Sequence, residues 1–153
     1  MSMNTAHSLF KYKSQISFHM NGEYKEKLPF GQGDLIVTKN NFYIQFYFSG
    51  PDMRYSGTFL KIDSNKIDSY IIAYKNNWNK YKELNDIKTK LGNEFSLTGE
   101  LGMKISIGGW INGICIDNYH MPLDSEKKIN DIIDSFSWAK EKGPEIMNFL
   151  KSF

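Results

Sequence analysis

The sequence is poor in residues that build covalent or metal-dependent sites. It has one cysteine, Cys115, which cannot form an internal disulfide, so nothing indicates an oxidising compartment. Cys115 follows Ile114 in an apolar run, and this setting favours a small buried side chain over a reactive thiol. The histidines are His7, His19 and His120. None is spaced to share a helix face with another, and a zinc site needs several converging ligands.

Other catalytic patterns are also missing. The chain has no G-x-S-x-G motif for a hydrolase nucleophile, and the glycines Gly31 and Gly33 lack the Lys-Ser/Thr pair of a phosphate-binding loop. We therefore expect no catalytic residue, no metal and no cofactor, and a protein that is not an enzyme. A site assembled from dispersed residues is the remaining route to an enzyme, and a deep pocket with two titratable groups would indicate it.

Arginine and long apolar runs are scarce as well. Arg54 is the only arginine and the formal net charge is +2. Bidentate recognition of phosphate and guanine favours arginine, so this composition disfavours a dedicated nucleic-acid binder. No run approaches the roughly 18 apolar residues of a membrane helix. The first residues, 1–13, are polar and do not resemble a signal peptide. We expect a cytoplasmic protein that does not contact a membrane.

Apolar and aromatic residues, by contrast, are abundant, at 41% and 15% of the 153 residues. This composition predicts a folded globule and not a disordered chain. The length is that of one ordinary domain, and it suffices to bury a core without disulfides. We therefore expect a single domain over residues 1–153, with residues 1–10 frayed.

Alternating apolar and polar residues predict strands in the first half of the chain. The predicted strands cover residues 15–20, 34–39, 42–49 and 53–62. The alternation is clearest in residues 42–49, where Phe and Ile occupy one face, and Tyr43 and Tyr47 the other. Asn40-Asn41 suits a tight turn, so the second and third strands should form a hairpin. Gly57 indicates a bulge in the fourth.

The period then changes to that of a helix. Asp63 is a suitable N-cap, and a helix is predicted over residues 64–82. Its apolar stripe is Ile67, Tyr70, Ile71, Tyr74, Trp78 and Tyr81. Residues 84–90 fit either a helix or a loop, and Leu91-Gly92-Asn93 is a stop signal.

Three more strands and a second helix complete the pattern. The strands are predicted at residues 94–99, 101–107 and 111–119, with Gly108-Gly109 as the turn between the last two. A helix over residues 125–141 should be capped by Asp124 or Ser125. Gly143-Pro144 should break it, and Pro144 could begin a short final helix.

This order of elements predicts an α+β fold. Short turns between neighbouring strands indicate a mainly antiparallel sheet of six to seven strands. Each predicted helix has one apolar stripe, so both helices, 64–82 and 125–141, should pack on one face of that sheet. A strongly curved sheet around the first helix fits the same pattern.

Two groups of aromatic or apolar residues are candidate binding sites. Tyr43 and Tyr47 share a strand face, and Arg54 on the next strand could complete a platform that stacks on bases or sugars, or that contacts a protein. Aromatic residues also commonly cover the outer face of an antiparallel sheet without binding anything. Trp110 and Ile111, just after the predicted turn, form the second candidate.

The second half of the chain resembles small bacterial immunity proteins. The similar segments are the helix Ile67–Tyr81, the run Lys90-Leu91-Gly92-Asn93-Glu94-Phe95, the run from Met103 to Gly109, and the closing helix Ile129–Phe136. The chain is similar in this way to the WapI-like proteins and the wider set that protects against contact-dependent and polymorphic toxins. The resemblance covers about residues 63–136. It implies a cytoplasmic, non-enzymatic protein that binds and blocks one toxin domain, and it implies no particular site residue.

Two functions follow as hypotheses. The first is an immunity protein whose partner is its cognate toxin domain. The alternative is a module that binds nucleic acid or a small ligand through the face of Tyr43, Tyr47 and Arg54, and that should lose affinity steeply with salt if the ligand is a nucleic acid.

Overall fold

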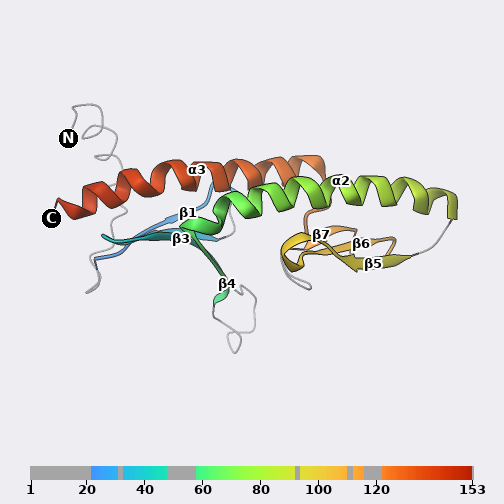
Figure 1. Cartoon of the computed structure of the whole chain (residues 1–153), viewed down its shortest axis with the longest axis horizontal. Helices are drawn as coiled ribbons and strands as arrows, with labels where there is room; N and C mark the ends of the chain where they lie inside the picture. The colour runs from blue at the N-terminus through green and yellow to red at the C-terminus, as the bar shows by residue number, and fades with distance from the viewer. Residues whose placement is uncertain are drawn as a thin grey trace. The chain divides into compact units, whose positions relative to one another are not determined.

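The computed structural model describes residues 22–30, 33–47, 58–91, 94–109, 112–115 and 122–152 (Figure 1). The chain divides into two compact units. Unit 1 combines Met1–Ile67 with Ser135–Phe153, and unit 2 is the continuous segment Asp68–Asp134. The expectation of one domain over residues 1–153 stays a prediction.

Unit 1 contains an antiparallel sheet in the order β1-β2-β3-β4. Its strands are β1 (Tyr24–Lys27), β2 (Asp34–Val37), β3 (Phe42–Tyr47) and β4 (Thr58–Asp63). The hairpin between β2 and β3 is confirmed, and Leu35 lies opposite Ile44. The turn closes because the Thr38 amide donates to the Asn41 carbonyl at 2.8 Å, while the Thr38 hydroxyl accepts from the Asn41 amide at 3.1 Å.

Strand β1 was not predicted. Its sequence, Tyr-Lys-Glu-Lys, shows no apolar alternation, yet Tyr24 is fully buried opposite Val37. The predicted strand at residues 15–20 and the predicted bulge at Gly57 lie outside the described residues. The register does shift between Phe46 and Tyr47, where β3 pairs with β4.

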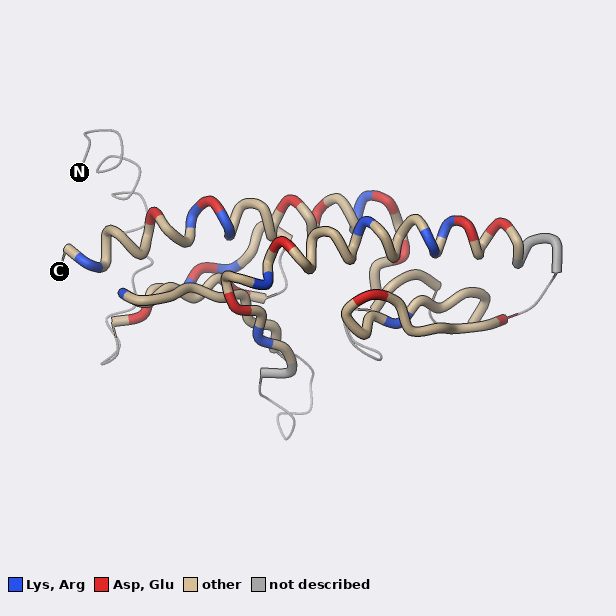
Figure 2. Tube along the Cα trace, viewed as in Figure 1, with Lys and Arg blue, Asp and Glu red and all other residues tan. Residues whose placement is uncertain are grey.

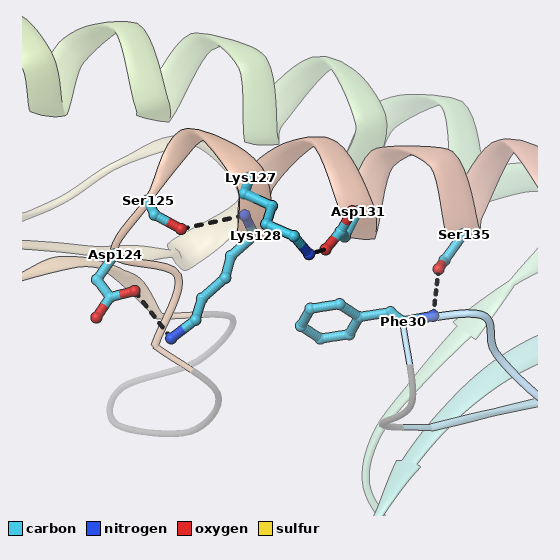
Figure 3. Close-up of polar contacts among 7 residues, drawn as sticks. All are labelled: Phe30, Asp124, Ser125, Lys127, Lys128, Asp131 and Ser135. Atoms are coloured by element: carbon cyan, nitrogen blue, oxygen red, sulfur yellow. Dashed lines mark hydrogen bonds and ion pairs between the residues drawn. The ribbon is translucent and has the colours of Figure 1, made fainter.

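Helix α3 (Glu126–Lys151) packs its second half on this sheet within unit 1. The rings of Phe46 and Phe136 lie with centroids 6.2 Å apart. The Phe30 amide donates to the hydroxyl of Ser135 at 2.7 Å, which joins the loop after β1 to the helix (Figure 3). Ser135 is fully buried, so this bond satisfies a polar group that has left water.

The predicted break at Gly143-Pro144 was wrong, because α3 continues through both residues to Lys151. A proline inside a helix removes one hydrogen bond and costs about 3 kcal/mol. Burial of Ile146 and Leu150 beyond the proline offsets this cost. Gly143 is buried where an added Cβ would lie 2.3 Å from the Phe42 ring, so it serves a close approach of helix and sheet and does not end the helix.

Unit 2 contains the second antiparallel sheet, in the order β5-β6-β7. Its strands are β5 (Phe95–Thr98), β6 (Lys104–Ile107) and β7 (Gly113–Cys115), with the short 3-10 segment η4 (Glu100–Gly102) before β6. Helix α2 (Ile67–Leu91) belongs to this unit from Asp68 onward, and the first part of α3, up to Asp134, belongs to it as well. Cys115 is fully buried, as its apolar setting predicted.

The α+β class, the antiparallel pairing and the two principal helices are confirmed. The strands form two sheets, however, where the sequence predicted one. A short 3-10 segment, η3 (Ser64–Lys66), precedes α2, and Asp63 stands at its N-cap position without a side-chain cap bond. Helix α2 also includes residues 84–90, which the sequence left open between helix and loop.

Ser125, one of the two predicted N-caps, caps the N-terminus of α3. The hydroxyl of Ser125 accepts from the amide of Lys128 at 3.2 Å (Figure 3). Asp124 instead pairs with the Lys128 amine at 2.9 Å, and Lys127 pairs with Asp131 at 2.8 Å. The Asp124–Lys128 contact, chiefly its hydrogen bond, lowers the pKa of the Asp124 carboxyl, although both groups are exposed and the pair contributes little to stability.

Candidate interaction surface

The structure describes only part of the predicted binding residues. Tyr43 lies in β3 and is half-buried. Tyr47 ends β3, but its side chain is outside the described part of the chain, as are the residues Arg54, Trp110 and Ile111. The predicted binding platform of Tyr43, Tyr47 and Arg54 and the predicted binding site at Trp110 and Ile111 therefore stay predictions.

The surroundings of Tyr43 are aromatic and of mixed charge. The Lys61 ammonium lies over the Tyr43 ring, 4.3 Å from its centroid, which is a cation–π contact. Asp63 is the cross-strand neighbour of Tyr43, and Gln45 that of Lys61. On the next strand, Asp34 pairs with Lys25 at 3.6 Å. This face thus carries both signs of charge around one tyrosine.

A second candidate surface lies in unit 2, at the turn that joins β5 to β6. The Met103 amide donates to the Glu100 carbonyl at 3.2 Å, which closes a four-residue turn. Its two central residues both have positive φ, 55° for Leu101 and 73° for Gly102. Positive φ at both positions is the mark of a type I′ turn, which joins twisted antiparallel strands.

Leu101 is exposed over half of its surface. The sequence predicted a strand over residues 101–107, in which Leu101 would share one face with Met103, Ile105 and Ile107; these last three are buried. That prediction was wrong for Leu101, because the strand begins only at Lys104. The flanking glycines Gly99 and Gly102 were the available signal for a turn here.

The turn is held to helix α2 by one buried amide. The Asn77 side chain is 2% exposed, and its oxygen accepts from the Glu100 amide at 2.8 Å. Its nitrogen donates to the Glu100 carbonyl at 3.1 Å and to the Met103 sulfur at 3.1 Å. Gly99 permits this approach, since a Cβ there would lie 2.4 Å from the Asn77 oxygen. One side chain therefore holds both backbone groups of Glu100.

A second amide holds the Glu100 side chain at the surface. The Asn76 nitrogen donates to both carboxylate oxygens of Glu100, at 3.2 and 3.0 Å. Ile72 lies one helical turn before Asn76 on the same face of α2 and is 56% exposed. We call Ile72, Asn76, Glu100 and Leu101 the turn patch. It places two exposed apolar side chains around a carboxylate that is bonded to an uncharged group.

One tyrosine of α2, Tyr74, is fully buried, and Tyr70 and Tyr81 are half-buried. Burial raises the pKa of Tyr74 well above its usual value of 10.0, and neighbouring Tyr70 adds to the increase. The Trp78 and Tyr81 rings stack with centroids 4.8 Å apart, and the Trp78 indole donates to Glu126 at 3.4 Å. Since a raised pKa keeps the phenol protonated, Tyr74 is suited to packing and not to proton abstraction at neutral pH.

The described residues contain no group of three or more His, Cys, Asp or Glu side chains that could hold a metal ion. None of the helices in the described ranges combines the length and the apolar character that crossing a membrane requires. Along α2 and α3, basic and acidic residues are interspersed and do not gather into a stretch of one sign (Figure 2).

Comparisons with protein-family models, with curated proteins and with solved structures gave no match to this chain.

Proposed function

We propose that this protein acts in the cytoplasm by binding another protein, and that the partner is a bacterial toxin domain encoded beside it, which it neutralises without a chemical reaction. The observation that carries the proposal is the turn patch. Two apolar side chains are exposed, Leu101 in the turn and Ile72 on α2, and the turn is held by two hydrogen bonds that Asn77 donates and one that it accepts. Exposed apolar groups on a rigid support are typical of protein-binding surfaces.

The resemblance to immunity proteins supports the same conclusion. It spans about residues 63–136, and unit 2 is Asp68–Asp134. The turn patch lies inside this unit. The part of the chain that resembles immunity proteins therefore contains the turn patch.

The test uses the whole 153-residue chain. The protein would be produced together with the toxin domain of the adjacent gene, and both cell survival and complex formation would be measured. We expect survival of cells that make both proteins, and a stable complex on size-exclusion chromatography. An unrelated toxin domain is the specificity control. Death of the doubly expressing cells, with no complex, would refute the proposal.

A second candidate function is nucleic-acid binding by the sheet face of unit 1. It is favoured by the Lys61 ammonium over the Tyr43 ring, since this pair combines a base-stacking surface with a charge for phosphate. The nearby Asp63 and Asp34 oppose it by repelling phosphate. Anisotropy of a labelled single-stranded oligonucleotide should then fall steeply between about 50 and 200 mM salt. Absence of binding at the lower salt would remove this function.

A further inference from the structure

The backbone of Leu101 is unfavourable for the residue that occupies it. Its φ of 55° and ψ of 29° lie in the left-handed region, where the Cβ of an L-residue crowds the following carbonyl. The two central positions of a type I′ turn favour Asn, Asp or Gly, and Gly102 fits that rule at the second. Leucine at the first position is therefore not explained by the turn.

Packing within the chain does not explain Leu101 either. Its side chain is half exposed, whereas the other apolar residues of the same run, Met103, Ile105 and Ile107, are at most 1% exposed. A half-exposed leucine gains only part of the stabilisation that full burial would give, and asparagine at this position would relieve the backbone and be well solvated. A strained residue that contributes little to its own fold is a recognised mark of a functional position.

The turn also holds Leu101 in a fixed position before any partner arrives. Asn77 bonds both backbone groups of Glu100, the residue directly before Leu101. Asn76 fixes the Glu100 carboxylate at 3.0 and 3.2 Å. A side chain presented on an ordered turn loses less entropy on binding than one on a loose loop.

We infer that Leu101 is inserted into an apolar pocket of the toxin domain, that Ile72 contacts the edge of that pocket, and that Glu100 faces a basic residue there. This inference rests on the proposed function. The pocket is apolar because a leucine must fill it. Its edge is basic because a basic residue would complement the exposed Glu100 carboxylate, whose side-chain partner within the chain is the uncharged amide of Asn76.

The deciding variant is Leu101→Asn, which suits the positive φ and removes the apolar side chain. We expect its urea midpoint to equal or exceed that of the unsubstituted protein, while its affinity for the toxin domain falls at least about tenfold. Leu101→Gly should behave alike, because glycine also accepts this backbone. The matched control is Ile87→Asn, which removes another exposed apolar residue, 42% exposed, from α2, and should leave the affinity unchanged.

The possible outcomes separate the two claims. If the unsubstituted protein binds the toxin domain and Leu101→Asn binds equally well, this inference is overturned and the proposed function stands. If the unsubstituted protein neither binds nor protects, both are lost. A lower urea midpoint for Leu101→Asn would show that the leucine is kept for stability, against the argument made from strain. Dissociation of a homodimer by the same substitution would show that a second copy, and not a toxin, occupies the patch.

Discussion

The contact between Gly143 and Phe42 predicts that Gly143→Ala destabilises unit 1. An alanine Cβ would lie 2.3, 2.5 and 2.6 Å from three atoms of the Phe42 ring, whereas ordinary contact begins near 3.4 Å. Phe42 is only 8% exposed, so the ring has little room to move away. Overpacking of this kind typically costs about 1–3 kcal/mol.

A helix-propensity gain acts in the opposite direction. Alanine is favoured over glycine inside a helix by about 1 kcal/mol, so pure propensity would stabilise the variant. An overlap of more than 1 Å with a buried ring places the cost at the upper part of the overpacking range. We therefore expect a net loss of about 1–2 kcal/mol in the free energy of unfolding.

Urea denaturation followed by far-ultraviolet circular dichroism measures this loss as a lower midpoint at unchanged slope. Gly109→Ala is the matched control, because the nearest atom to an added Cβ there is a Glu94 oxygen at 4.0 Å. Its free energy of unfolding should stay within about 0.5 kcal/mol of the original or rise slightly. Adding Phe42→Leu to Gly143→Ala should recover part of the loss, as a double-mutant cycle. A more stable Gly143→Ala protein would contradict the close packing of helix and sheet.

Three further predictions concern polar and backbone features of the fold. Asn77→Ala should lower stability by about 1–3 kcal/mol in urea denaturation, since it leaves the backbone of Glu100 without its buried partners; the exposed neighbour change Asn76→Ala should cost under about 0.5 kcal/mol. Pro144→Ala should raise the thermal midpoint, because it restores a helical hydrogen bond inside α3, and a fall would show that the proline is needed. Stability should also decline above about pH 10, because the pKa of Tyr74 is higher in the folded protein than in the unfolded chain. The Tyr74 phenol therefore contributes its full stabilisation below the unfolded pKa, and this contribution is lost as the pH rises toward the folded pKa. A urea-denaturation series from pH 8 upward should show a falling midpoint, and an unchanged or rising midpoint would contradict this prediction.

The sequence predicted the elements whose periodicity reflects local burial. The alternation from Phe42 to Tyr47 gave β3 and its hairpin, and the apolar stripe through Tyr74 and Trp78 gave α2. Ser125 could be predicted as a cap because its short side chain suits the first turn of a helix. These signals depend only on residues that are close in the sequence, so they can be read from one sequence alone.

Features fixed by distant contacts could not be predicted in this way. Gly143 and Pro144 are helix breakers by propensity, and only the Phe42 ring and the buried residues beyond them explain why α3 continues. Strand β1 is mostly charged, so its pairing with β2 is visible only in three dimensions. Leu101 continued an apolar alternation, and the alternation concealed the turn that now carries the candidate surface.

The division of the chain between the two units has a consequence for synthesis on the ribosome. Unit 2 is one continuous segment, Asp68–Asp134, so all of its residues emerge in succession. Unit 1 needs Ser135–Phe153, which are translated after unit 2, to cover a sheet whose strands are translated before unit 2. During translation, the apolar face that carries Phe46 therefore stays exposed to solvent until Phe136 has been synthesised and can pack on it. We expect a nascent chain stalled before residue 135 to bind chaperones through that face, while its unit 2 already resists proteolysis.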